Sequence, residues 1–336
     1  MFHPKSRIHI VPVIAVALTL LLALATDQAR AQIRIHMIPF DSVTLSTQQV
    51  LLGETQGKPV TLAGELRLPG IGTNKVPVVI LVHGFGGLMP YHFEWVNALN
   101  SWGIGVFIPD HLSGRGIAPG SPEEFMVFGS SRMVDIYQAL PRLLKHPRID
   151  PERIAIMGFS LGGYVTLLSS QERFRQRYGL PNFKFAAHIA VYPLCNMRLR
   201  DDAKVAAQAI RIFHGTADDA NPVEPCRVLV ADLKKAGADA TLTEYAGALH
   251  AYDNPAWKER LNLPQFMTPR NCSLVEGEGG QMMNSKTGKL FTPGDPCIEF
   301  GASFQYDEAA TTSTREAVKE VLTSAFAAKP ATAAPK

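Results

Sequence analysis

The strongest chemical signal in the chain is a serine between two glycines. Residues 158–162 read Gly-Phe-Ser-Leu-Gly, a match to G-x-S-x-G; an apolar run, 154–157, precedes them and an apolar helical pattern follows. A sharp turn from strand to helix strains the backbone of the central residue and exposes its hydroxyl. The flanking positions must then be nearly free of side chains, which explains Gly158 and Gly162. We predict that Ser160 is a nucleophile rather than part of a chance Gly-Ser-Gly turn.

A serine hydroxyl needs a base to take its proton, and the base needs a carboxylate to orient it. With this kind of turn, the partners follow the serine in the order acid, then histidine. Three histidines follow Ser160: His188 lies inside an apolar strand pattern, His214 precedes the candidate acids, and His250 lies in a loop after the last predicted strand. His250 is therefore the predicted base, and His188 is predicted to be a core residue.

The acid is expected in the loop 213–222, at the carboxyl end of the strand before the one that leads to His250. Asp218 and Asp219 are adjacent in this loop. One member of such a pair often only caps the next helix. The residue types alone therefore leave both aspartates open as the acid.

The tetrahedral intermediate of acyl transfer carries a negative oxygen, which needs two fixed N–H donors. We predict that one donor is the backbone N–H of Leu161, directly after Ser160 at the start of a helix. The other is predicted to be the N–H of Phe85, because residues 83–87 read His-Gly-Phe-Gly-Gly and glycines let a backbone approach an ester. The side chain of His83 is predicted to be structural.

Apolar patterns predict alternating strands and helices, and hence an α/β fold with a mostly parallel central sheet covered by helices on both faces. Segment 33–52 is predicted to form one or two peripheral strands, and 60–69 an edge strand. Buried strands are predicted over 76–82, 104–108, 154–157, 186–192, 209–213 and 240–245. Helices are predicted over 91–102, 125–144 with an interruption at Pro141, 226–236 and 314–327.

Two segments depart from this alternation. Residues 255–312 are rich in Gly, Asn and Pro and are predicted to form an irregular excursion within one domain of residues 32–328; whether the excursion covers the site as a lid stays open. No second domain of convincing size is predicted. The Ala/Pro-rich tail, 329–336, is predicted to be disordered.

The N-terminus, residues 1–31, has the pattern of a secretory signal peptide: a basic start, an apolar run over 8–25, and Ala-Arg-Ala at 29–31. An uncleaved membrane anchor is the alternative, since the run nearly spans a bilayer, but Pro12 and the small-residue site favour cleavage. We expect a periplasmic or secreted protein without a stable membrane anchor. Loss of three basic residues and one acidic residue takes the formal charge from +3 to +1, which gives no long-range field for nucleic acid or anionic membranes.

All four cysteines lie after this leader. An even number of cysteines in an exported chain predicts two disulfides rather than buried free thiols, with three possible connectivities. The cysteines are Cys195, Cys226, Cys272 and Cys297.

Four stretches resemble the dienelactone hydrolase family of α/β-hydrolases, and the likeness runs over residues 60–325. In that family the acid stands three residues after the glycine of the strand-end loop, with a proline four residues beyond it; Gly215 and Pro222 place Asp218 there. The loop 108–116 also resembles a family loop near the active site. The matching stretches are 79–87, 153–163, 213–219 and 245–253.

Two departures from the family pattern bear on the substrate. Dienelactone hydrolases proper have a cysteine nucleophile and are cytoplasmic, whereas this chain has Ser160 and a leader. The chain therefore looks like an exported, serine-bearing branch of the family, and a dienelactone is not the expected substrate. Sequence proximity, and the strand-end position of Cys195, predict the pairings Cys195–Cys226, near the rim of the site, and Cys272–Cys297, which would staple the excursion.

The resemblance implies a serine hydrolase that cleaves small-molecule carboxylic esters or lactones through an acyl-enzyme. Ser160 would be the nucleophile, His250 the base and Asp218 the orienting acid, and no metal or organic cofactor is needed. A peptidase of the prolyl-oligopeptidase type is one alternative, but it would normally bring a large second domain. A non-catalytic binding protein on the same fold is another, but it would be expected to lack one member of the triad. The oligomeric state is not indicated.

Overall fold

The computed structural model describes residues 34–70, 72–206 and 209–327. The predicted signal peptide, 1–31, and the predicted disordered tail, 329–336, lie outside the described residues. Within those three ranges, no helix combines the length and the apolar character needed to cross a membrane.

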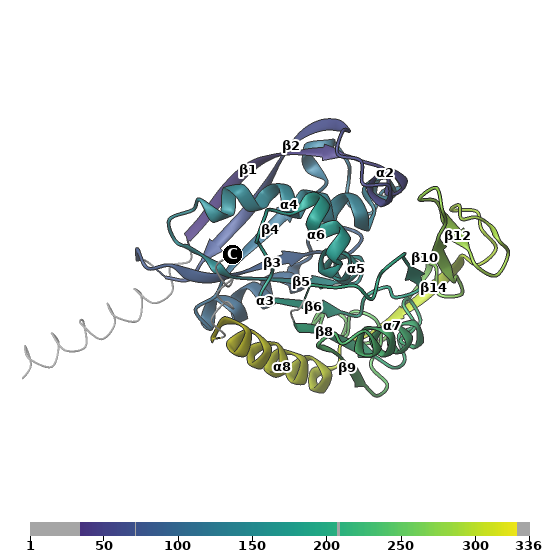
Figure 1. Cartoon of the computed structure of the whole chain (residues 1–336). Coiled ribbons are helices and arrows are strands. Elements are labelled where there is room, and N and C mark those ends of the chain that lie inside the picture. The colour runs from purple at the N-terminus through teal and green to yellow at the C-terminus, as the bar shows by residue number, and fades with distance from the viewer. Residues whose placement is uncertain (1–33, 71, 207–208, 328–336) are drawn as a thin grey trace, which may run out of the picture.

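An eight-stranded sheet forms the centre of the molecule, in the order β1-β2-β4-β3-β5-β6-β8-β9 (Figure 1). The strands from β4 to β9 run parallel, while β2 is antiparallel to both of its neighbours. The predicted mostly parallel sheet is therefore confirmed. The strands are β1 Arg34–Thr44, β2 Lys58–Leu68, β3 Val76–Val82, β4 Gly105–Asp110, β5 Ile149–Phe159, β6 Ala187–Val191, β8 Ala209–Gly215 and β9 Ala240–Tyr245.

Helices cover both faces of this sheet, as the alternation of apolar patterns predicts (Figure 1). Alternate residues of β6 face opposite layers: Ile189 packs in the cluster that includes α3 and α8, and Ala190 in the cluster that includes α7. The helices of the first face are α3 Pro90–Ser101 and α8 Glu308–Ala327. Those of the second are α4 Gly129–Leu144, α5 Leu161–Ser170, α6 Glu172–Tyr178 and α7 Glu224–Lys235.

The predicted edge strand is an interior strand. β2 lies between β4 and β1, and β1 pairs with it along its whole length, from Arg34 opposite Leu68 to Thr44 opposite Lys58. The outermost strand is therefore β1. The rest of the segment expected to hold a second peripheral strand contains the short helix α2, Thr47–Leu51, which Ser46 and Gln49 begin with a capping box.

The structure differs from the predicted helix 125–144 in two respects: the helix begins later, and Pro141 does not interrupt it. A 3-10 helix, η2 Pro122–Val127, precedes α4, and α4 continues through Pro141 to Leu144. A proline inside a helix removes one hydrogen bond to the preceding turn. Because α4 ends three residues later, the loss does not interrupt the helix. α8 begins at Glu308, six residues before its predicted start.

The excursion contains regular structure that its sequence does not signal. β10 Leu261–Thr268 pairs with β14 Glu299–Phe304, and β11 Leu274–Glu276, β12 Met282–Asn284 and β13 Lys289–Leu290 join β7 Met197–Arg198 in a four-stranded sheet. Most of these strands have two or three residues, too few for an alternating pattern to be recognisable. The structure forms both expected disulfides, Cys195–Cys226 and Cys272–Cys297.

Candidate active site

Ser160 lies at a sharp turn between β5 and α5, with φ 52° and ψ −117°. Residues other than glycine rarely adopt a positive φ, and such strain is about 1–3 kcal/mol per residue. A Cβ atom on Gly158 would lie 2.0 Å from the carbonyl oxygen of Gly162, and one on Gly162 would lie 2.1 Å from that of Val82. The predicted strained turn with side-chain-free flanks is therefore present.

The structure brings Ser160, His250 and Asp218 together from three loops. His250 Nε2 lies 2.9 Å from Ser160 Oγ, and its Nδ1 lies 2.7 Å from Asp218 Oδ2. The loops follow β5, β8 and β9, whose carboxyl ends share one edge because these strands are parallel. Ser160 is partly exposed, whereas His250 and Asp218 are buried. This arrangement can pass the hydroxyl proton to the imidazole while the carboxylate holds the ring.

Asp218 is fixed on both of its oxygens. Oδ1 accepts the backbone N–H groups of Ala220 and Asn221, at 3.0 and 2.8 Å, which leaves Oδ2 for His250. The side chain of Asp219 faces elsewhere and accepts the backbone N–H of Ser303 at 2.7 Å. Of the two candidate acids, only Asp218 contacts His250 within the described residues.

The two other histidines that follow Ser160 are buried. Burial lowers the pKa of His188 to about 4, so the ring is neutral at physiological pH, in keeping with the predicted core position. His214 has its Nδ1 3.9 Å from Asp218 Oδ2, and burial lowers its pKa below the ordinary value. Neither ring replaces His250 at the serine.

A polar group behind His250 was missed by the sequence analysis. The ring of Tyr192 packs against that of His250, with 4.8 Å between the ring centroids, and the Tyr192 hydroxyl donates to Asp253 at 2.6 Å. Asp253 also accepts the indole N–H of Trp95 at 2.6 Å, and burial raises the pKa of this carboxyl. The sequence signal for this group is slight. Asp253 stands only three residues after His250, but Trp95 and Tyr192 come from segments that are distant in sequence.

The loop after β3 approaches Ser160 closely. A Cβ atom on Gly84 would lie 3.3 Å from Ser160 Cβ, and Gly86 and Gly87 have φ of +87° and +81°, which glycine adopts at no steric cost. The Nδ1 of His83 lies 2.8 Å from the carbonyl oxygen of Gly84. Burial, and then the charge of Arg132, lower the pKa of His83 well below its ordinary value, so the ring is neutral. The predicted structural role of His83 fits these contacts.

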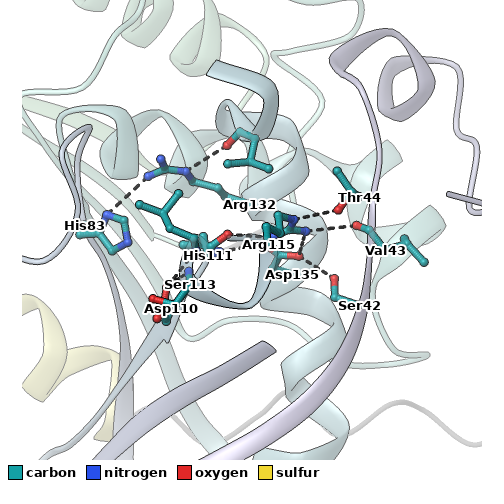
Figure 2. Close-up of polar contacts among 12 residues, drawn as sticks. Ser42, Val43, Thr44, His83, Asp110, His111, Ser113, Arg115, Arg132 and Asp135 are labelled. Atoms are coloured by element: carbon teal, nitrogen blue, oxygen red, sulfur yellow. Dashed lines mark hydrogen bonds and ion pairs between the residues drawn. The ribbon is translucent and has the colours of Figure 1, made fainter. Parts of the chain in front are cut away.

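The loop 108–116 contains Arg115, whose guanidinium is buried and hydrogen-bonded inside the protein (Figure 2). Arg115 donates to both oxygens of Asp135 on α4, at 2.8 and 2.9 Å, and to Thr44 Oγ1 of β1 at 2.9 Å. His111 Nδ1 lies 2.9 Å from the same carboxylate, and Ser42 donates to it at 2.5 Å. These contacts join α4, β1 and the 3-10 helix η1, Ser113–Arg115, so the guanidinium serves the fold rather than a substrate.

Aromatic side chains from three elements form a row that starts at the loop after β3. Successive ring centroids lie 5.0, 6.3 and 6.1 Å apart, and Phe125 is 38% exposed as a residue. The last ring stands one helical turn after the serine, on α5. The members are Phe85, Phe125, Phe128 and Tyr164.

The sheet, its two layers of helices and the serine at the turn after β5 define a serine hydrolase of the α/β-hydrolase fold. The model of the dienelactone hydrolase family matches residues 67–326, and the chain belongs to that family.

The chain is also similar to a curated relative and to solved structures. An uncharacterized peptidase of Bacillus subtilis, YuxL, is 26% identical over 210 residues; these are 53% of this chain and 31% of the relative, so the chain spans about a third of that protein. A structure titled m3DLH is similar with a TM-score of 0.54 and 15% identity, over 88% of this chain and 99% of the other. An acylaminoacyl peptidase bound to a chloromethyl ketone is similar with a TM-score of 0.51 and 18% identity, over 69% and 40%. The two structures speak to the fold alone.

Proposed function

We propose that the protein is a carboxylic-ester hydrolase that works through an acyl-enzyme. The observation that supports this most is the continuous chain of contacts from Ser160 Oγ through His250 to Asp218, at 2.9 and 2.7 Å. In this proposal Ser160 attacks the acyl carbon while His250 Nε2 takes its proton. Asp218 keeps the other ring proton on Nδ1 and stabilises the imidazolium.

The remaining steps use backbone groups and the same histidine. The N–H groups of Leu161 and Phe85 bind the oxyanion, the first at the start of α5 and the second in the loop beside Ser160. His250 then returns the proton to the departing alcohol. A water molecule then enters, and its oxygen attacks the acyl carbon while His250 takes one of its protons. His250 returns this proton to Ser160 Oγ as the bond between Oγ and the acyl carbon breaks, which releases the acid and the free enzyme.

The substrate is proposed to carry an apolar acyl group. Besides Ser160 Oγ, the tetrahedral carbon carries the oxyanion, the leaving oxygen and the acyl group, and these point in different directions. The oxyanion points to the N–H donors, and the leaving oxygen points to His250. Along the sheet, His250 follows β9, whereas Phe85 and Phe125 follow β3 and β4, on the opposite side of Ser160. The acyl group therefore faces the aromatic row, where apolar surface is removed from water on binding.

The protein is further proposed to act outside the cytoplasm. Its two disulfides support this, because disulfides persist in oxidising compartments and are rare in reducing ones.

Labelling with a fluorophosphonate tests the assignment of the nucleophile. The wild-type protein is expected to be labelled and to hydrolyse p-nitrophenyl esters, and Ser160→Ala is expected to lose the label and several orders of magnitude of turnover. Labelling that survives the substitution would refute the assignment.

Peptidase activity is a second candidate, favoured by the similarity to a relative named as a peptidase. Peptide p-nitroanilides assayed beside esters and lactones decide between the two.

A further inference from the structure

Helix α4 contributes to two buried ion pairs, through side chains one turn apart. Figure 2 shows Arg132, from the first pair, and Asp135 with Arg115, which form the second. Arg132 pairs with Glu124 of η2, and Asp135 pairs with Arg115; all four side chains are at most 4% exposed. Taking two charges out of water is costly, so a buried ion pair is by itself weak evidence of stabilisation. The contacts that each pair makes with its surroundings indicate what the pair does.

Glu124 and Arg132 bind the loop after β3 on both sides of Phe85. The carboxylate of Glu124 accepts the backbone N–H of Gly86, at 3.0 and 3.2 Å from its two oxygens, and the N–H of Gly120 at 2.7 Å. Arg132 donates to Glu124, to the carbonyl oxygen of Val127 at 3.0 Å and to that of Gly84 at 3.3 Å. The pair therefore fixes the peptide unit before Phe85 and the one after it.

The anchoring of the Gly84 carbonyl determines where the N–H of Phe85 points. The Nδ1 of His83 lies 2.8 Å from the Gly84 carbonyl oxygen and 3.5 Å from the guanidinium of Arg132. We assign the proton to Nδ1 on the shorter contact, so that His83 donates to the Gly84 carbonyl, as Arg132 does. In a trans peptide the C=O and N–H groups point in opposite directions, and the chain has no cis bond among its described residues. With the carbonyl held toward α4, the N–H of Phe85 is directed away from α4, and Ser160 lies against Gly84.

We infer that Glu124 and Arg132 are positioning residues for the oxyanion hole: they hold the Gly84–Phe85 and Phe85–Gly86 peptides so that the Phe85 N–H points at the developing negative charge. This inference rests on the proposed esterase mechanism. The other pair provides a matched control. Asp135 on α4 is as buried as Glu124 on η2, but its side chain binds His111, Arg115 and Ser42 instead of the loop after β3.

The test compares Glu124→Gln with Asp135→Asn in the full-length protein. Each substitution removes one buried charge with little change in shape, so both are expected to lower the thermal stability by a similar amount. Turnover of p-nitrophenyl acetate is measured per active site, counted by fluorophosphonate titration. The inhibition constant of phenylboronic acid, which forms a tetrahedral adduct on serine, is measured in parallel.

A misplaced donor weakens binding of the oxyanion more than binding of the substrate. Loss of a whole donor costs about 10²–10³-fold in kcat, so its displacement in Glu124→Gln is expected to cost about 10–100-fold. KM is expected to change little, and the inhibition constant of the boronic acid to rise by a factor similar to the loss of kcat. Asp135→Asn is expected to leave kcat and the inhibition constant near the wild-type values.

Arg132→Lys is the second variant and decides the matter if Glu124→Gln does not fold. Lysine keeps the charge opposite Glu124, but its single nitrogen cannot reach Glu124, Val127 and Gly84 together. A smaller loss of kcat and a smaller rise of the boronic acid inhibition constant are therefore expected, again with little change in KM. A folded variant of the Glu124–Arg132 pair with wild-type kcat, or equal losses in both pairs, overturns the inference and leaves the esterase intact. A wild-type protein without esterase activity overturns the proposed function and this inference with it.

Discussion

Replacing Asp218 by asparagine tests the acid with almost no change in shape. Oδ1 of Asp218 accepts two backbone N–H groups, from Ala220 and Asn221. If the asparagine turned its NH2 group to that side, its N–H groups would face these two backbone N–H groups with no acceptor between them. Its carbonyl oxygen is therefore expected to take the place of Oδ1. The NH2 group then occupies the place of Oδ2, 2.7 Å from His250 Nδ1.

This fixed orientation selects the wrong tautomer of His250. Nδ1 must accept from the amide, so the ring proton moves to Nε2, which then donates to Ser160 Oγ instead of taking its proton. Loss of the correct tautomer in a triad of this type costs about 10⁴-fold in kcat, which corresponds to about 5.5 kcal/mol in the activation free energy. KM is expected to change little, because the substrate does not touch the acid.

The assay is single-turnover acylation by a p-nitrophenyl ester, with thermal unfolding as a check that the variant is folded. Asp219→Asn is the matched control: its carbonyl oxygen still accepts the N–H of Ser303, so its rate is expected to stay within a few-fold of the wild type. The reasoning is wrong if Asp218→Asn keeps more than a tenth of the acylation rate, or if Asp219→Asn loses as much as Asp218→Asn.

Two further predictions concern the excursion and the acyl side of the site. Cys272→Ser is expected to lower the free energy of unfolding by about 3 kcal/mol, because its disulfide closes a loop with a sequence separation of 25; denaturant unfolding measures this, and no change would show that the loop is held by other contacts. Phe125→Ala is expected to lower kcat/KM about tenfold for p-nitrophenyl hexanoate while sparing the acetate, since burying part of a phenylalanine ring is worth about 1.5 kcal/mol. Leu290→Ala, at a 55% exposed position on β13, is the control for Phe125→Ala, and an equal loss on both esters would contradict the acyl assignment.

The three residues that the structure brings together at the candidate site were predictable because each carries a local signal. Ser160 has a five-residue pattern in a strand–helix context, and His250 and Asp218 follow strand ends in a fixed order. The choice between Asp218 and Asp219 depended on the family resemblance, since adjacent aspartates look alike in one sequence. Glu124 has no comparable signal, because its hydrogen bonds to Gly86 and Arg132 form only when η2, the loop after β3 and α4 are packed together.

The fold was predictable where burial imposes a pattern and less so where it does not. The strands β3 to β6, buried on both faces, give continuous apolar runs. The place of β2 was wrong because an alternating strand looks the same whether its neighbour is solvent or β1. The short strands β11 to β13 were missed because their pairing depends on contacts between segments distant in sequence, such as Leu274 with Met197.

The pairing of β10 with β14 makes the excursion a module on a two-stranded stem. The stem ends beside the triad, where Phe304 bridges His250, while the Cys272–Cys297 disulfide closes the far part upon itself. The chain therefore leaves and re-enters the core at one place. The part between Thr268 and Glu299 is attached to the core a second time, away from the stem: Leu274 of β11 pairs with Met197 of β7, and Glu276 accepts hydrogen bonds from Arg173 and Arg200. A change in the length of this part therefore has to preserve two attachments, one at β7 and one at the stem beside His250.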